Sequence, residues 1–240
     1  MSGLLTARQL DQIMTDHEKQ ILVHLSQFVS DHKKQFIEKV LNYRTRHITV
    51  VLEDVFQSQN ASAVVRTCEC LGVQDVHIVE QISKYEINPR VLKGANKWMD
   101  LHRYNDRTAN NTEQCFTKLK ENGYRIMVTD PSDAGSPIDQ IDIEEQKVAL
   151  VFGNELRGVS RFGLENADVR VKIPMYGFTE SLNLSVSVAI CLNVLITKLH
   201  RSPVANYLSE PEKEVLQLAW YRKIVRGSQI IEREFLRTID

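Results

Sequence analysis

The spacing of apolar and polar residues changes twice along the chain. From position 15 to position 41, apolar side chains return every three or four residues, which is typical of amphipathic helices. Between Ile48 and Leu199, short runs rich in β-branched residues alternate with segments of helical spacing. After Pro203 the spacing is helical again. The pattern therefore predicts an α/β region with helices before and after it.

Short β-branched runs predict buried strands at 48–55, 75–79, 124–129, 147–152 and 169–173. Helical segments lie between them, at 60–71, 112–122 and 161–166. Gly72 and Gly123 follow the first two of these helices, at the position where a left-handed residue commonly ends a helix. Strands that alternate with helices in this way predict an α/β fold with a mostly parallel sheet.

The segment 182–199 has features of both a strand and a helix. Its first residues, "LNLSVSV", alternate like a strand, whereas Val188, Leu192, Leu195 and Leu199 keep a helical period. Since 18 residues exceed the usual length of a strand, we predict a buried helix.

Two capping boxes mark helix starts outside the α/β region. In "TDHE" (15–18) and "SEPE" (209–212), a hydroxyl and a carboxylate can each satisfy a backbone amide at a helix N-terminus. We expect a helical extension over residues 1–46, an α/β domain over 47–200 and a helical appendage over 201–240. The pattern leaves open whether the N-terminal helices pack on the main domain or bind a partner.

The composition is that of a soluble globular protein, with 240 residues, 42% hydrophobic and 25% charged. No uninterrupted apolar run reaches the roughly 18 residues of a membrane span. The chain does not start with a basic segment followed by an apolar signal core. We therefore expect a cytoplasmic protein without a membrane partner.

Charge and cysteine content exclude some further classes of function. The net charge of −1 argues against wholesale attraction to nucleic acid, although it allows a local basic face. The cysteines, Cys68, Cys70, Cys115 and Cys191, lack the spacing of metal ligands, so we expect reduced thiols and no metal site.

Two loops that follow predicted strands carry polar residues near a helix start. In the first, Asn60 is expected at a helix N-cap and Arg66 follows on the second turn. In the second, "LVFGNELRGVS", Gly153 and Gly158 flank Glu155 and would let the backbone approach a ligand closely. Neither loop has the glycine pattern of a dinucleotide or nucleoside triphosphate site. In open α/β sheets, ligands bind at such strand ends.

A third loop, "IPMYGFTESLNLSVSVA", places polar residues before the long apolar helix. Ser181 or Thr179 is expected to cap that helix. Capping explains one polar residue, whereas Asn183 and Ser185 offer further donors and acceptors at the same end. This end of the helix is therefore predicted to face a polar ligand.

Together, "NASAVVRTCECLG", "FGNELRGVS" and "IPMYGFTESLNLSVSVA" resemble, in order and spacing, the three motifs of the SPOUT-class RNA 2′-O-methyltransferases, specifically the TrmH family. The resemblance covers roughly residues 48 to 199. The segment "KGANKWMDLHRY" and the helices at both ends look like the tRNA-modifying branch of that family.

The resemblance implies a C-terminal trefoil knot, a homodimer with its site near the subunit interface, and S-adenosylmethionine as methyl donor. It implies no metal. The residues that it assigns to cofactor binding come from the second and third motifs: Phe152, Gly153, Asn154, Glu155, Gly158, Ile173, Met175, Ser181 and Leu182.

The resemblance also implies that Arg66 activates the ribose hydroxyl with the help of Asn60, and that Glu155, Ser181 and Asn183 belong to the functional set. Because the pKa of arginine exceeds about 12, two roles remain open for Arg66. A substrate phosphate could arrange a proton transfer, or a charged Arg66 could orient the ribose and stabilise the developing alkoxide.

RNA would be held by basic residues outside these motifs, through contacts with phosphates. The candidates are Arg44, Arg46, Arg103, Arg107, Arg157, Arg161, Arg222, Lys223 and Arg226. We expect 2′-O-methylation of tRNA at a D-loop guanosine. The alternatives are the same reaction on ribosomal RNA and a non-catalytic RNA-binding protein.

Overall fold

The computed structural model describes residues 14–86, 88–132, 134–203 and 207–239, and it divides the chain into two compact units. One unit spans Thr45–Asn206, and the other joins Met1–Arg44 with Tyr207–Asp240. The two terminal segments, which we expected as separate helical pieces, are thus parts of one unit.

A seven-stranded sheet forms the centre of the unit Thr45–Asn206 in the described part of the chain, and every paired strand in it is parallel. The predicted α/β fold with a parallel sheet is therefore confirmed. The order is β3-β2-β1-β6-β4-β7-β5. The strands are β1 (Ile48–Glu53), β2 (Asp75–Val79), β3 (Asp100–Tyr104), β4 (Tyr124–Thr129), β5 (Ser136–Pro137), β6 (Lys147–Phe152) and β7 (Val169–Lys172).

Two strands were not predicted. β3 has the sequence "DLHRY", and most of its residues are only half-buried at the edge of the sheet. It therefore lacks the continuous apolar run of a central parallel strand. β5 has two residues and exists through its pairing with β7.

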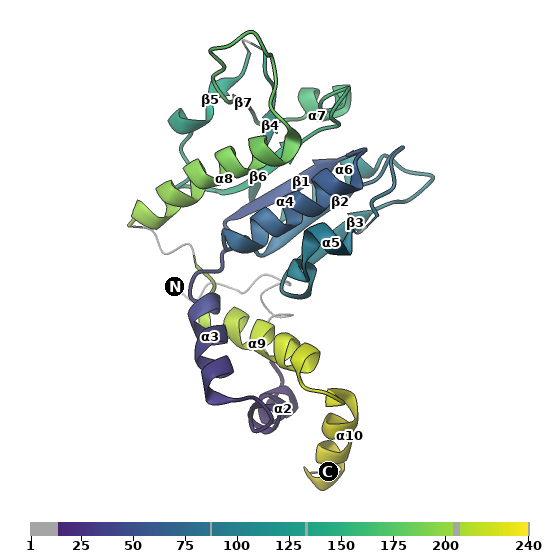
Figure 1. Cartoon of the computed structure of the whole chain (residues 1–240), viewed down its shortest axis with the longest axis vertical. Helices are drawn as coiled ribbons and strands as arrows, with labels where there is room; N and C mark the ends of the chain where they lie inside the picture. The colour runs from purple at the N-terminus through teal and green to yellow at the C-terminus, as the bar shows by residue number, and fades with distance from the viewer. Residues whose placement is uncertain (1–13, 87, 133, 204–206, 240) are drawn as a thin grey trace. The chain divides into compact units, whose positions relative to one another are not determined.

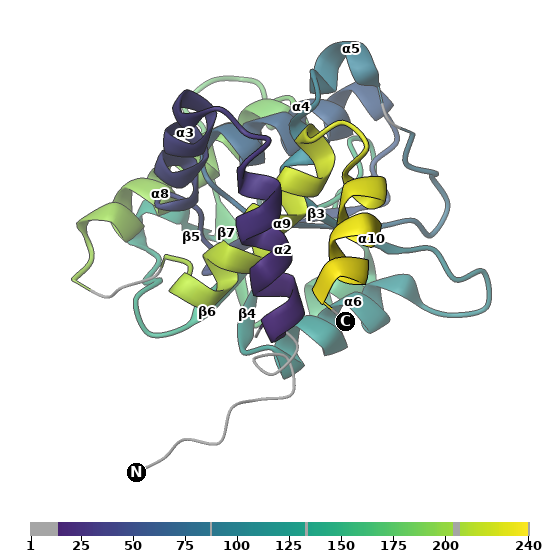
Figure 2. The same ribbon diagram turned by 90° about the horizontal axis from the view of Figure 1, so that it is seen from below.

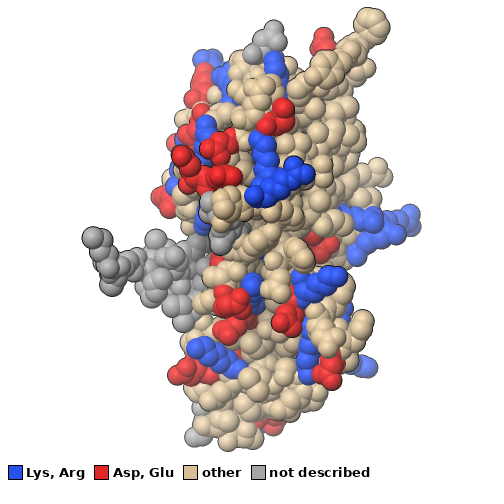
Figure 3. Space-filling view, turned by 90° about the vertical axis from the view of Figure 1, so that its left-hand side faces the viewer, with Lys and Arg blue, Asp and Glu red and all other residues tan. Residues whose placement is uncertain are grey.

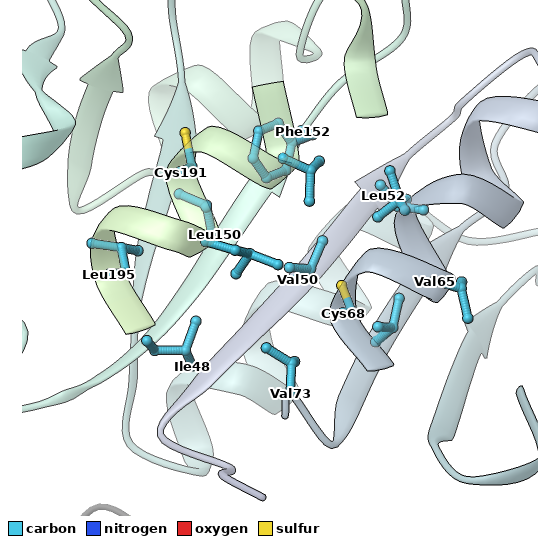
Figure 4. Packing of buried hydrophobic residues seen from close by; sticks show 14 of the residues in the cluster. Ile48, Val50, Leu52, Val65, Cys68, Val73, Leu150, Phe152, Cys191 and Leu195 are labelled. Carbon is cyan, nitrogen blue, oxygen red and sulfur yellow. The ribbon is translucent and has the colours of Figure 1, made fainter. Parts of the chain in front are cut away.

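Helices cover both faces of the sheet (Figure 1). α4 (Ser58–Cys70), α5 (Pro89–Leu92) and α8 (Leu184–Arg201) lie on one face, where Val50 and Leu150 point. Side chains from β1, β6, α4 and α8 meet there in one apolar cluster (Figure 4). The short η1 (Ala95–Lys97) and η2 (Ile138–Gln140) lie on the same side.

The opposite face is covered by α6 (Asn111–Glu121) and α7 (Arg161–Glu165), whose apolar residues pack against Val51, Ala149 and Val151. Because successive side chains of a strand point to opposite faces, the unbroken apolar runs of β1 and β6 supply both cores.

α8 is long and apolar enough to cross a membrane by length and composition alone. Its residues Val188, Leu192, Leu195 and Leu199 are instead buried in the cluster that also contains Leu150. A helix that packs on a sheet in this way is a core helix, as its helical period predicted.

The second unit consists of α2 (Asp16–Ser26), α3 (Asp31–Leu41), α9 (Glu210–Ile224) and α10 (Ser228–Ile239) among its described residues. Both predicted capping boxes are present, at the starts of α2 and α9. α2 packs against α9 and α10, and α3 packs against α9 (Figure 2).

Two helix starts differ from the prediction. α4 begins at Ser58 with Gln57 as its N-cap, so Asn60 lies inside the first turn. α8 is capped by Asn183, whose side chain accepts a hydrogen bond from the backbone amide of Ser185 at 2.9 Å, and not by Ser181 or Thr179. Several polar residues precede each helix, and any of them satisfies the capping preference.

We predict that Leu192→Ala lowers the free energy of unfolding by about 2–5 kcal/mol, because it leaves a cavity in the core beneath α8. Val186→Ala in the same helix is the matched control, since this side chain is 45% exposed. Its effect should stay within about 1 kcal/mol. Denaturant unfolding measures the free energy of unfolding of both variants. Equal losses for Leu192→Ala and Val186→Ala would contradict the burial of the face of α8 that carries Leu192.

Candidate active site

A cavity of about 590 Å³ opens at the carboxyl ends of β4, β6 and β7, beside the N-termini of α4 and α8. In an open parallel sheet, the loops after neighbouring strands meet at one edge, which explains why residues distant in sequence form one wall. Asn60 and Asn183 line this cavity. Its lining also includes every residue expected to hold the cofactor, namely Phe152, Gly153, Asn154, Glu155, Gly158, Ile173, Met175, Ser181 and Leu182.

The loop after β6 closes on itself at the edge of this cavity. The amide of Asn154 donates to the carbonyl of Gly158 at 2.9 Å, and the amide of Gly158 donates back at 2.8 Å. A Cβ atom on Gly153 would lie 2.2 Å from the carbonyl carbon of Gly158, so no side chain fits there. Gly158 has a φ of +69°, which favours glycine. Backbone therefore forms this part of the wall.

One chain of hydrogen bonds connects the three sequence motifs. Nδ2 of Asn60 donates to Oε1 of Glu155 at 2.9 Å, and Nδ2 of Asn183 donates to Oδ1 of Asn60 at 3.2 Å. The carboxylate of Glu155 also accepts from the backbone amides of Phe56 and Gln57. The network thus ties the β1–α4 loop, the β6–α7 loop and the start of α8 together.

The pKa of Glu155 is lowered in this setting. Partial burial opposes ionisation, but the hydrogen bonds from Asn60 and from the amides of Phe56 and Gln57 together outweigh it. The ionised carboxylate is therefore the form that the network stabilises, because it accepts hydrogen bonds at both oxygens.

Arg66 is not part of the cavity wall within one chain. It lies six residues after Asn60 on α4, and six helical residues correspond to a rotation of roughly 240°, onto a different face of the helix. Asn60 is buried and Arg66 is exposed. Among the residues that line this cavity, the first motif is represented by Asn60 and not by Arg66. The role of Arg66 in the reaction stays a prediction.

The cavity also contains residues that the motifs did not indicate. Thr129, Asp130 and Pro131 follow β4, and Lys172 ends β7. The polar run "TDPS" after a buried strand was a usable signal, since ligands bind at the carboxyl ends of such strands. The pKa of Asp130 is lowered because hydrogen bonds from Ser132 and the charge of Arg170 outweigh its partial burial.

Two of the expected RNA contacts are corrected by the structure. Arg44 is 1% exposed and lies over the ring of Trp220, 5.5 Å from its centroid. Arg46 forms ion pairs with Asp75 and Asp100, the latter at 2.7 Å. Burial opposes the charge of Arg46, but these two carboxylates outweigh it and raise its pKa. Both guanidinium groups are therefore held by contacts within the fold and are not offered to phosphates.

The other basic candidates are at least partly accessible. Arg103 pairs with Glu80, Arg157 with Asp54, Arg161 with Glu165 and Arg222 with Glu232. Of these pairs, only that of Arg161 with Glu165 is exposed on both sides. Such an exposed pair contributes little free energy, so a phosphate can replace this carboxylate. Arg107, Lys223 and Arg226 are exposed.

On the surface shown in Figure 3, basic side chains are interspersed with acidic ones and form no wide basic patch. This distribution agrees with the near-zero net charge.

The fold and the cavity agree with comparisons to known proteins. Residues 47–193 match the SpoU rRNA Methylase family, and the chain therefore belongs to this family of methyltransferases. A tRNA (guanosine(18)-2′-O)-methyltransferase of Borreliella burgdorferi is 45% identical over 193 residues, which cover 80% of this chain and 86% of the relative. The enzyme of the same name from Thermus thermophilus is 34% identical over 153 residues, covering 64% and 76%.

Solved structures show the same fold. The TrmH/SpoU tRNA modifying enzyme of A. aeolicus has a TM-score of 0.71 and 29% identity, and the match covers 81% of this chain and 98% of that one. The SpoU methyltransferase AviRb from Streptomyces viridochromogenes, solved with the cofactor AdoMet, has a TM-score of 0.57. At 18% identity over 68% of this chain and 65% of that one, it shows the fold alone. The trefoil knot implied by the resemblance stays a prediction.

The lowered pKa of Glu155 predicts a pH dependence. A carboxyl group whose folded pKa lies below its unfolded value, about 4.3 for Glu, stabilises the protein above that value. This contribution is lost as the pH falls through the folded pKa. Between about pH 6 and pH 3, the wild type should therefore lose more unfolding free energy than Glu155→Gln.

Denaturant unfolding at several pH values measures this difference. Glu121→Gln, a substitution at an exposed position at the end of α6, is the matched control and should follow the wild-type curve. A Glu155→Gln curve parallel to that of the wild type would contradict the network.

Proposed function

We propose that this chain transfers a methyl group from S-adenosylmethionine to the 2′-hydroxyl of a guanosine in the D-loop of tRNA. The observation that carries the proposal is that residues of all three motifs line the same cavity. Asn60, Glu155 and Asn183, one from each motif, are connected there by hydrogen bonds. The names of the relatives from Borreliella burgdorferi and Thermus thermophilus support tRNA as the substrate.

The residues of the cavity fit S-adenosylmethionine. Its volume of about 590 Å³ lies in the range of small-molecule sites, which are mostly apolar with a few polar groups. Ile173, Met175 and Leu182 supply apolar surface, and the backbone around Gly153 can approach a ligand closely. When bound, this cofactor supplies a methyl group already activated on a sulfonium.

The chain would contribute orientation and the handling of one proton. The hydrogen-bond network holds Asn60 and Asn183 in one arrangement, and preorganised polar groups accelerate a transfer by aligning the reactants. Arg66 would act on the ribose hydroxyl, either in a proton transfer assisted by a substrate phosphate or as a charged group that stabilises the developing alkoxide.

The position of Arg66 supports a homodimer. Arg66 is exposed and lies outside the cavity of its own chain, so a complete site requires the partner's Arg66. In a symmetric dimer both sites are completed in this way, because each subunit contributes its Arg66 to the cavity of the other subunit. We expect this dimer to act in the cytoplasm.

Ribosomal RNA is a second candidate substrate. The description of the matched family, SpoU rRNA Methylase, favours it.

We predict that Arg66→Ala lowers the turnover number about 10²–10⁴-fold, the usual contribution of a group that manages a proton. Its affinity for S-adenosylmethionine should be unchanged, since Arg66 does not line the cavity. Methyl transfer to tRNA and calorimetric titration measure the two quantities. Turnover near that of the wild type would remove Arg66 from the mechanism.

A mixture of two inactive variants tests whether Arg66 acts on the partner's site. In a hybrid of Arg66→Ala and Glu155→Ala chains, one of the two sites combines an intact cavity with the partner's Arg66. Random pairing should restore about 25% of the wild-type rate. If Arg66 served its own cavity, no hybrid site would be intact and the mixture would stay inactive.

Mapping ribose methylation identifies the substrate. RNA from cells with and without this protein should differ at one D-loop guanosine of tRNA. A difference confined to ribosomal RNA would replace tRNA by the second candidate, and no difference in either RNA would sink the proposed activity.

A further inference from the structure

A second cavity lies on the other side of the β6–α7 loop. Its volume is about 600 Å³, and it is formed by the β1–α4 loop, the loop after β2 and the loop after β6. These loops follow parallel strands and therefore reach the same edge of the sheet (Figure 1). Asn154 lines both this cavity and the candidate active site, so the two are neighbours.

Asp54 holds the three loops together. Its side chain accepts from the amides of Ile82 and Ser83 at 2.7 and 2.6 Å and from Arg157 at 3.2 Å. Its carbonyl accepts from the side chain of Asn154 at 2.8 Å. Asp54 also has a φ of +55°, an unfavourable backbone conformation that recurs at functional sites. The cavity is thus a built feature and not a gap between loose loops.

Large apolar side chains surround this cavity and remain in solvent. Phe56 is 68% exposed, Ile82 71% and Leu156 88%. Apolar side chains that gather around one hollow are typical of a binding site, whereas single exposed ones are not. Lys84 adds a positive charge at the same rim and Glu86 adds one carboxylate, whereas the charge of Arg157 is paired with Asp54.

We propose that this cavity receives an unpaired nucleotide of the substrate RNA, next to the ribose that is methylated. The inference rests on the proposed function. Proteins recognise single-stranded RNA by stacking unpaired bases on aromatic and apolar side chains and by neutralising phosphates. Phe56 supplies the aromatic face, Ile82 and Leu156 the apolar walls, and Lys84 the cation. The carboxylate of Glu86 can accept from a base N–H.

Because the second cavity shares a wall with the candidate active site, a nucleotide bound in it can position the ribose that is methylated. The amide of Phe56 donates to Glu155 at 3.0 Å, so the residue that contacts the base also contacts the hydrogen-bond network of the active site. A nucleotide held in the second cavity would fix the ribose beside it at the mouth of the first.

Substitutions at Phe56 test the stacking. Phe56→Ala should raise the KM for tRNA about 5- to 100-fold, the usual loss when one base loses its aromatic partner, and should leave the affinity for S-adenosylmethionine unchanged. Phe56→Trp, which keeps an aromatic face, should restore a KM near the wild-type value. The Phe56 amide remains in both variants, so its bond to Glu155 is not removed.

The phosphate contact is tested through salt. Lys84→Gln should reduce the slope of log K against log salt for tRNA binding by about 0.7, the value for one phosphate on a single strand. Lys118→Gln on α6 is the matched control, because Lys118 is exposed on an element that does not line this cavity, and its slope should be that of the wild type.

Any one of four results would overturn the proposal. Phe56→Ala with a wild-type KM, or Lys84→Gln with the salt slope of Lys118→Gln, would show that no nucleotide binds here while the methyltransferase activity stands. A Phe56→Ala variant that sediments as a monomer where the wild type is a dimer would make the cavity a subunit contact. A wild type that methylates no tRNA would remove the proposed function and this inference together.

Discussion

The side chain of Asn60 is the link on which the candidate active site depends. Its amide donates to Glu155, 95 residues away in sequence, and accepts from Asn183, 123 residues away. A buried amide that lacks a hydrogen-bond partner costs free energy. The two hydrogen bonds of Asn60 therefore restrain the segments that carry Glu155 and Asn183. Three loops that would otherwise move independently are held in one arrangement.

The parallel sheet makes this link available. Every loop that contributes to the cavity follows a strand at the same edge, because all paired strands run in one direction. The chain order of the strands reverses at β1, which pairs with β2 on one side and with β6 on the other. Ligand sites of open α/β sheets occur at such a reversal. The two neighbouring cavities share Asn154, at the start of the loop after β6.

Much of the fold was predictable from local pattern. The predicted bounds of β4 and β6 agree with the structure, because these central strands are buried on both faces and read as continuous apolar runs. β3 lacked this signal since it lies at an edge. For the site, the motifs indicated the residues of the cavity wall, but Thr129 and Asp130 belong to no motif and were missed.

The sequence by itself determined the alternation of the central strands with helices, the two capping boxes and the residue types at the strand ends, because these depend on neighbours a few positions apart. Only the tertiary structure decided which polar residues face the cavity and which do not. Arg44 and Arg46 look like surface cations in sequence, yet Arg44 is buried against Trp220 and Arg46 is paired with two carboxylates. Arg66 lies on a different face of α4 from Asn60. Burial and side-chain direction depend on contacts between distant segments, and local spacing does not contain them.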